Sequence, residues 1–191
     1  MTTDKLARRQ SAQQSVLLGA AFEEWVNTQH EMAGLRGALA HVIHNMPPSK
    51  YINGRLMYEE AGVADFTGCL HGGGFLAAEA KSVAPGERLA RKRISMKQEL
   101  HLDAVTAAGG NSHAFLLVEF RAEAALLHRH YAIPWHQVPW KIVRSAESLD
   151  EKDIAQVFRV MPGDDYFKFY HPGSSRRYIV GDRVKHVYPT E

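Results

Sequence analysis

Two acidic residues and one lysine are spaced so that they can meet on one face of a β-hairpin. Asp65 is followed, after a glycine-rich turn, by Glu79 and Lys81. Strands over 62–66 and 75–82 with a turn centred on residue 72 place Asp65 opposite Glu79, because their numbers sum to twice 72. Opposed residues have β-carbons roughly 4.5–5.5 Å apart, and two like charges there need a compensating partner. Lys81 follows Glu79 by two residues and therefore shares its face of the strand.

A divalent cation is the natural partner for such a pair of carboxylates. Hard oxygen ligands suit Mg²⁺, and Mn²⁺ can replace it. The apolar residues 75–78 lead directly into Glu79, and a buried carboxylate without a partner is costly. A bound metal polarises a phosphate and activates water, while a nearby ammonium stabilises developing negative charge. The pattern therefore predicts metal-dependent phosphodiester hydrolysis, with a structural Glu79–Lys81 ion pair as the alternative.

The elements that must position these residues follow from periodicity and turn signals. Residues 1–10 are expected to form a polar, mobile arm. Beyond the hairpin, we expect helices over 11–32, 87–108 and 148–158, strands over 38–45, 114–120 and 126–133, and a terminal hairpin over 178–187. The order predicts an α/β fold with a mixed central β-sheet flanked by helices.

Composition narrows the class of protein. The chain has 191 residues, of which 45% are hydrophobic and 23% charged, as expected for one globular domain. Its single cysteine, Cys69, excludes an intramolecular disulfide and suits a reducing compartment. No apolar run resembles a signal peptide or a membrane span, so we expect a cytoplasmic protein without a membrane partner. The net charge of +2 requires any nucleic-acid surface to be a local patch.

Four ordered motifs lie between about residues 15 and 140. They are Gly-Ala-Ala-Phe-Glu at 19–23, His-Val-Ile-His-Asn-Met-Pro at 41–47, the hairpin over 62–81, and Gln-Glu-Leu-His-Leu at 98–102. Together they resemble the motifs of RecU-type Holliday junction resolvases, members of the PD-(D/E)xK nuclease superfamily. The resemblance implies a restriction-endonuclease-like core over 11–161, with a short stalk-like insertion at 47–62. We expect residues 162–191 to form a C-terminal extension, which matches no motif of the family. The family often carries threonine where this chain has Ala64.

The resemblance assigns roles to the hairpin residues and to two helical side chains. Asp65 and Glu79 would bind the metal, with the main-chain carbonyl of Ala80 completing the inner shell. Lys81 would orient the attacking water or stabilise the charge of the transition state. Gln98 would face the same site, the alternative being an exposed helix glutamine.

The first helix would supply a further acidic ligand. Glu23 is expected to bind the metal directly or through water, and the neighbouring Glu24 is the alternative. Glu23 lies one turn beyond Gly19, a residue that permits close packing against a sheet.

Two groups of side chains are expected to contact DNA. Contacts to phosphates supply most of the affinity of proteins for DNA. Five cations fall in one predicted helix, although such a run is usually a solvated face: Arg88, Arg91, Lys92, Arg93 and Lys97. The insertion at 47–62 contributes cations and an aromatic ring, with an ordinary solvated loop as the alternative: Lys50, Arg55 and Tyr58.

The resemblance implies a structure-selective DNA endonuclease that resolves four-way junctions in recombination or repair. Two symmetric cuts require two symmetric sites, so we expect a homodimer, in a bacterial or phage-infected cell. The alternatives are another nuclease of the superfamily, acting on flaps or duplexes, and a catalytically weak junction-binding protein. His128 and His130 share a strand face, but the sequence offers no third ligand beside them, so zinc is not expected.

Overall fold

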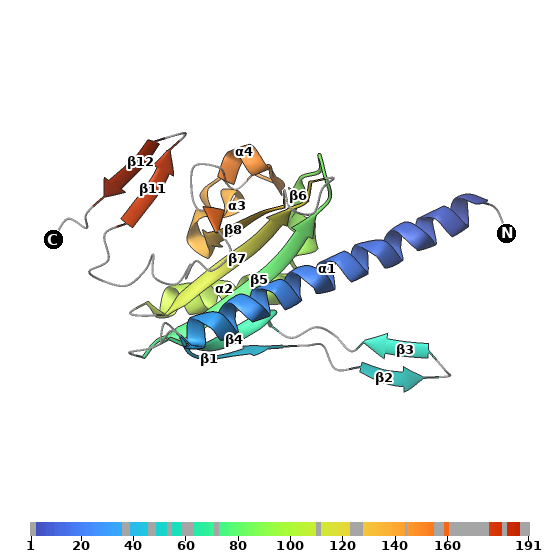
Figure 1. Ribbon diagram of the computed structural model, residues 1–191, viewed down its shortest axis with the longest axis horizontal. Helices are drawn as coiled ribbons and strands as arrows, with labels where there is room; N and C mark the ends of the chain where they lie inside the picture. Colours follow the sequence, from blue (N-terminus) through green and yellow to red (C-terminus); the bar gives the residue numbers. More distant parts are fainter. Residues whose placement is uncertain are drawn as a thin grey trace.

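The computed structural model describes most of the backbone: residues 3–35, 39–45, 49–52, 55–58, 63–70, 73–109, 112–122, 128–143, 145–154, 159–160, 176–180 and 183–187. Its centre is one six-stranded mixed sheet (Figure 1). In spatial order the strands are β1 (Leu39–His44), β4 (Phe66–Leu70), β5 (Phe75–Val83), β7 (His113–Phe120), β8 (Arg129–Pro134) and β10 (Arg159–Val160). Strands β5 and β7 are parallel, and all other neighbours are antiparallel. The expected mixed α/β fold is thus confirmed.

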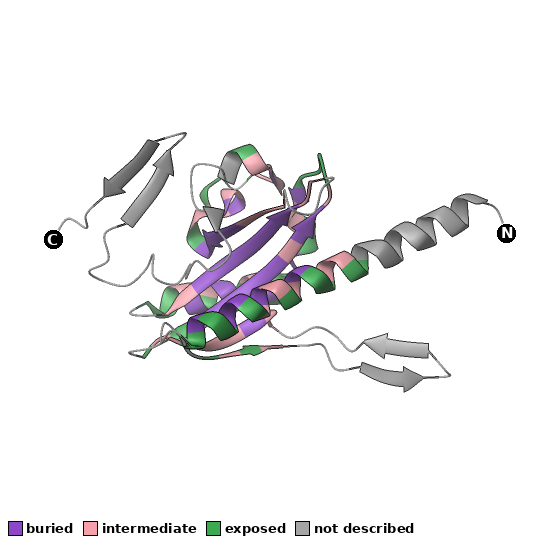
Figure 2. Ribbon diagram, viewed as in Figure 1, coloured by how far each residue is buried: buried purple, intermediate pink, exposed green. Residues whose placement is uncertain are grey.

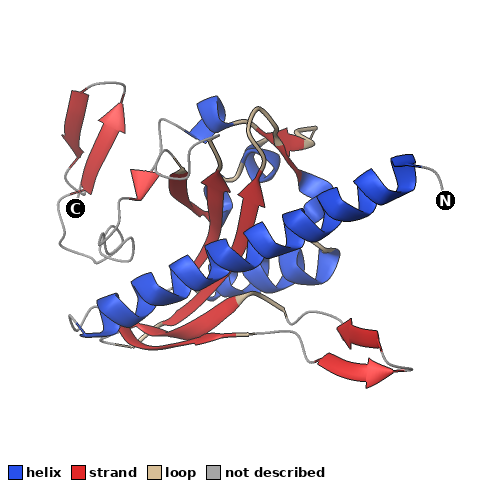
Figure 3. Ribbon diagram, turned by 45° about the vertical axis from the view of Figure 1, so that its right-hand side comes forward, coloured by secondary structure: helices blue, strands red, loops and turns tan. Residues whose placement is uncertain are grey.

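Two long helices cover the two faces of this sheet (Figures 2 and 3). Helix α1 (Thr3–Leu35) buries Phe22 and Val26 against alternate residues of the sheet, among them Phe66 and Ala78. Helix α2 (Met96–Ala108) joins β5 to β7 and buries Leu102 in the cluster on the other face. Because both faces are covered, β5 and β7 are buried along nearly their whole length.

Smaller elements surround the sheet. They are the hairpin β2 (Ser49–Ile52) and β3 (Arg55–Tyr58), the pair β6 (Leu89–Ala90) and β9 (Ser148–Leu149), the short helices η1 (Arg91–Arg93), η3 (Trp135–Gln137), α3 (Pro139–Ile142) and α4 (Glu151–Ile154), and the hairpin β11 (Arg176–Val180) and β12 (Arg183–Val187). Figures 1 and 3 both draw β2–β3 away from the six-stranded sheet. Within the described part of the chain, no helix combines the length and the apolar character that a membrane crossing requires.

Several expected elements have different bounds. Strands β1, β7 and β8 and the terminal hairpin are confirmed to within a few residues. The separate arm is wrong for residues 3–10, which belong to α1. The helix expected over 148–158 is wrong at its start: residues 148–149 pair with β6, and α4 begins at Glu151. Residues 155–158 and 161–175 lie outside the described part of the chain.

The helix expected from residue 87 begins nine residues later, at Met96. Ser95 is its N-cap: its hydroxyl accepts a hydrogen bond from the main-chain N–H of Gln98 (3.2 Å), and the Gln98 side chain accepts one from the N–H of Ser95 (2.9 Å). This reciprocal pair fixes where a helix starts. Residues 89–90 instead form β6, which pairs with β9, and Arg91–Arg93 form the short helix η1. The basic residues 88–93 ahead of α2 are therefore not part of one helix.

Two glycines of the resemblance motifs have opposite surroundings. A β-carbon on Gly68 would lie 2.2 Å from the carbonyl oxygen of His41 and 2.7 Å from the Cα of Val42, because β1 crosses closely there. A β-carbon on Gly19 would have nothing within 4 Å. The expectation that Gly19 permits close packing against the sheet is therefore wrong.

These surroundings predict opposite effects of the same substitution. Gly68→Ala should destabilise the protein by about 1–3 kcal/mol, because β1 must move to admit the methyl group. Gly19→Ala should stabilise α1 by up to about 1 kcal/mol, since alanine has the higher helix propensity. Urea unfolding of the two variants beside the wild type measures both changes. A Gly68→Ala protein with wild-type stability would contradict the packing of β1 on β4.

Candidate active site

Strands β4 and β5 pair in the register that the sequence predicts. Phe66 lies opposite Ala78 and Cys69 opposite Phe75, so every paired sum is 144, and one further step places Asp65 opposite Glu79. The strand expected over 62–66 is displaced, however: β4 starts at Phe66, and Asp65 lies immediately before it. The Asp65 carboxylate accepts a hydrogen bond from the main-chain N–H of Ala80 (2.8 Å).

The ammonium group of Lys81 contacts three oxygen-bearing groups at once. It pairs with Oε1 of Glu79, donates to the carbonyl oxygen of Ala80 (3.0 Å), and lies 3.5 Å from Oδ2 of Asp65. These are the three groups that the sequence analysis expects to hold a metal. One positive charge therefore already lies among them, and the Glu79–Lys81 ion pair that was the alternative is present.

Glu79 is fully buried, and its second oxygen, Oε2, has no hydrogen-bond partner. Burial raises the pKa of the Glu79 carboxyl, the charge of Lys81 opposes this, and the charge of Asp65 adds to it, giving a pKa of about 8. An unpaired buried oxygen is costly unless something binds it. The donor set therefore fits a divalent cation held by two carboxylates and one carbonyl.

No group of three His, Cys, Asp or Glu side chains among the described residues is arranged to hold a metal ion. The oxygens around Lys81 come instead from two carboxylates and the main chain. Such a mixed set is usual for Mg²⁺, which keeps several of its own waters.

Gln98 lies at this site and not at the helix surface. It is 7% exposed, and its amide nitrogen donates a hydrogen bond to Oε1 of Glu79. Since the same side chain closes the capping box with Ser95, the start of α2 is tied directly to the central strand. The alternative of an exposed helix glutamine is wrong.

Glu23 is near the site, but its carboxylate contacts another residue. Its Oε2 lies 3.1 Å from Nε2 of His44. Burial raises the pKa of Glu23, and the negative charge of Asp65 raises it further. Glu24 is exposed, so Glu23 is the better candidate of the two. Its expected role as a metal ligand, direct or through water, stays a prediction.

The five cations expected on one helix face are spread over several elements. Arg88 precedes β6 and Lys97 belongs to α2, while the other three form η1. The prediction of a single basic helix face is therefore wrong. Lys92 and Lys97 are exposed, and these two side chains are the better candidates for contacts to a phosphate backbone.

The arginines of this group have partners within the protein. Arg91 donates two hydrogen bonds to Glu99 (3.0 and 3.2 Å). Arg93 donates to the carbonyl oxygen of Ser82 (2.9 Å). Arg88 lies 3.9 Å from a carboxylate oxygen of Asp150. Arg91 and Arg93 thus tie the segment between β5 and α2 to these two elements, whereas Arg88 lies beside the residue that follows β9.

Three candidate DNA-binding residues belong to the β2–β3 hairpin. Arg55 pairs with Ile52, Tyr58 with Ser49, and Lys50 lies in the same strand as Ser49. Their side chains lie outside the described part of the structure, so their contacts remain predictions.

A polar cluster on the α1 face of the sheet was not predicted from the sequence. Glu119 accepts a hydrogen bond from the Ser82 hydroxyl (2.6 Å) and lies 3.2 Å from Nδ1 of His128 and 3.3 Å from Nε2 of His130. Burial alone would raise the pKa of Glu119, but hydrogen bonds from His130 and Ser82 lower it overall. Glu119 is thus a hydrogen-bond partner of both histidines, and the register that pairs Glu119 with His130 brings the carboxylate to them.

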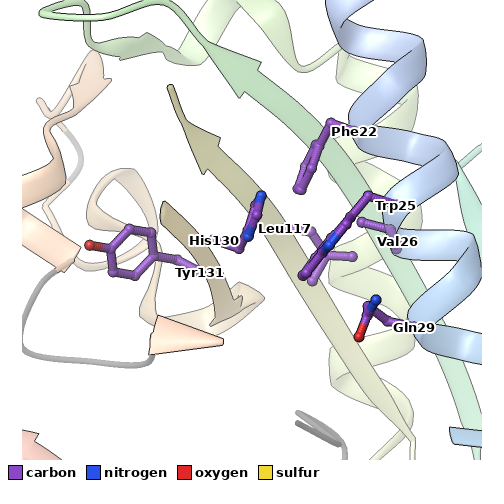
Figure 4. A pocket seen from close by; sticks show the side chains of 7 residues that line it. All are labelled: Phe22, Trp25, Val26, Gln29, Leu117, His130 and Tyr131. Carbon is purple, nitrogen blue, oxygen red and sulfur yellow. The ribbon is translucent and has the colours of Figure 1, made fainter. Parts of the chain in front are cut away.

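The same His130 ring packs against α1. It stacks on Trp25 with 3.9 Å between ring centroids, beside a small, mainly apolar pocket (Figure 4). The pocket lies between α1 and the sheet and is lined by Phe22, Trp25, Val26, Gln29, Leu117, His130 and Tyr131. These contacts fix the helix that carries Glu23 against the sheet.

Comparison of the chain with protein-family models and with curated proteins finds no match. The motif resemblance and the geometry around Lys81 are therefore the observations from which a function can be argued.

Proposed function

We propose that this chain is a metal-dependent, structure-selective DNA endonuclease with a PD-(D/E)xK core, of the RecU-type junction resolvases. The observation that carries the proposal is the convergence of the Asp65 and Glu79 carboxylates and the Ala80 carbonyl on one cation, the Lys81 ammonium. The four ordered motifs support it, as does a mixed sheet with a helix on each face.

In this proposal Asp65, Glu79 and the carbonyl of Ala80 hold Mg²⁺, which Mn²⁺ can replace. When bound, such an ion polarises the scissile phosphate and lowers the pKa of a bound water. Lys81 leaves the ligand oxygens and stabilises the charge that develops on the phosphate. Gln98 keeps the Glu79 carboxylate oriented through the hydrogen bond already described.

The proposed substrate is a four-way junction, and the proposed assembly is a homodimer in the cytoplasm of a bacterial or phage-infected cell. Two copies related by a twofold axis present two equivalent sites, which matches two symmetric cuts. Exposed Lys92 and Lys97 and the β2–β3 hairpin supply phosphate contacts.

A substrate panel tests this proposal. Four-way junction, flap, duplex and single-stranded DNA are incubated with the protein in Mg²⁺ or in Ca²⁺. We expect paired symmetric cuts in the junction with Mg²⁺ and binding without cleavage with Ca²⁺. Cleavage of flaps or duplexes in preference to the junction would indicate another nuclease of the superfamily. Junction binding without cleavage in any divalent metal would indicate a non-catalytic binding protein.

Replacing residues 50–58 with a glycine–serine linker should reduce junction cleavage by about tenfold or more, because it removes cations and aromatic rings available to an open junction. The hairpin lies away from the six-stranded sheet (Figure 1), so the core and the metal site should be spared. Duplex cleavage and thermal unfolding of the same preparation are the controls. An unchanged preference for junction over duplex would assign junction choice to the dimer's shape or to residues 162–191.

Magnesium affinity should depend on pH. With a pKa raised to about 8, the Glu79 carboxyl takes up a proton more readily than an ordinary carboxyl as the pH falls, and an uncharged carboxyl is a poor ligand for Mg²⁺. Below pH 8 the affinity should therefore fall, by up to about tenfold per pH unit, and above it the affinity should level off. Calorimetric titrations between about pH 6 and 9 measure this, and proton release on binding is the independent check. A flat profile would mean that Lys81 keeps Glu79 ionised.

A further inference from the structure

Asn45 lies directly beside Asp65, one residue beyond the end of β1. The β1–β4 register pairs Ile43 with Thr67 and His44 with Phe66, so its next step pairs Asn45 with Asp65. The main-chain N–H of Asn45 donates a hydrogen bond to the carbonyl oxygen of Asp65 (2.7 Å). Since the β4–β5 register places Glu79 on the other side of Asp65, Asn45, Asp65 and Glu79 form one row across three chain segments.

The side chain of Asn45 holds the residues on both sides of Asp65. Its amide nitrogen donates to the carbonyl oxygen of Ala64 and to the hydroxyl of Thr67, both at 3.0 Å. Its amide oxygen lies 3.4 Å from the same hydroxyl, which can donate to it. Through its side chain and its main-chain N–H, Asn45 therefore hydrogen-bonds to Ala64, Thr67 and Asp65.

Asp65 needs such a restraint because it lies outside the regular strand. β4 begins at Phe66, yet the Asp65 carboxylate must be placed accurately enough to accept from the Ala80 N–H and to face Glu79. Asparagine is suited to the position because its amide carries two donors and one acceptor on a short stem. Aspartate would have no donor for the Ala64 carbonyl, and alanine would have neither group.

We propose that Asn45 is the positioning residue for Asp65, and that it sets the carboxylate where it faces Glu79. The effect of Asn45 on catalysis rests on the proposed nuclease function. Its effect on the position of the Asp65 carboxylate does not depend on that function. Asn45 acts through Asp65 and has no contact with the reacting atoms.

Asn45→Ala tests the proposal through the main-chain N–H of Ala80, which reports the place of the Asp65 carboxylate. We expect faster hydrogen exchange and a shifted amide resonance at Ala80. In the cleavage assay we expect kcat to fall by about tenfold or more, the Mg²⁺ concentration for half-maximal rate to rise, and KM for DNA to stay within about twofold. Asn45→Asp keeps an acceptor but lacks the donors to Ala64 and Thr67, so it should also speed exchange and shift the amide resonance at Ala80.

Two further variants make the test decisive. Thr67→Val removes one of the side-chain partners and should shift the Ala80 resonance in the same direction by less, which keeps the proposal testable if Asn45→Ala does not fold. Asn27→Ala removes a half-buried asparagine that bonds Glu31 on α1 and should change neither readout. An unchanged Ala80 resonance in both Asn45→Ala and Thr67→Val would overturn the positioning role, whatever the activity. A wild type that cleaves no DNA would overturn the nuclease function alone.

Discussion

Asp65→Asn and Glu79→Gln should each abolish magnesium-dependent DNA cleavage while leaving DNA binding nearly intact. Each substitution removes a negative charge from the proposed ligand set, and the phosphate contacts are expected elsewhere. A loss of at least about 10³-fold in kcat is expected, equivalent to about 4 kcal/mol of transition-state stabilisation. Both variants should fold, because an amide oxygen can still accept the hydrogen bonds from Ala80 to residue 65 and from Gln98 to residue 79.

Glu24→Gln is the matched control for these substitutions. It makes the same change of carboxylate to amide at an exposed position of α1, so it should cleave at the wild-type rate. Binding to a four-way junction in Ca²⁺ shows whether each variant still recognises DNA. Near-normal cleavage by either Asp65→Asn or Glu79→Gln would mean that the site is assigned to the wrong residues.

Lys81→Ala should lose most of its activity, by about 10²–10³-fold, without a loss of magnesium affinity. The rate falls because the ammonium that would stabilise the transition state is gone. Affinity is retained because the ammonium contacts the same oxygens that would hold the metal, and its removal takes away a competitor for them.

Calorimetry with Mg²⁺ and single-turnover cleavage separate these two effects of Lys81→Ala. Lys81→Met, which keeps most of the side-chain volume, should give the same result. Lys152→Ala, at an exposed position of α4, should change neither quantity. Magnesium affinity that falls in step with the rate would instead favour a structural ion pair between Lys81 and Glu79.

The sequence predicts best what is decided by local geometry. The register of β4 on β5 follows from a turn centred on residue 72, and the observed pairs keep that centre. The start of α2 was also readable, because Ser95 and Gln98 have the spacing of a capping box. The adjacent basic residues over 88–93 have the composition of an exposed helix surface. For this reason the predicted helix began at residue 87 and not after Ser95.

Contacts between distant segments could not be predicted from one sequence. Residues 89–90 form a strand and not part of the expected helix because Leu89 pairs with Leu149. No local sequence pattern predicts this pairing. In the same way, Glu119 meets His130 only through the register of β7 on β8. The alignment of Asn45 with Asp65 depends on β1 and β4, which are separated by the insertion at 47–62.

The ammonium of Lys81 has a practical consequence for kinetic work. Because it neutralises part of the carboxylate charge from within the chain, the protein should remain folded when a chelator removes divalent ions. If the protein is the nuclease proposed above, DNA would then bind to completion before any cut is made. A rapid magnesium jump would start all complexes from one state, so that the first and second strand cuts could be timed separately within a single binding event.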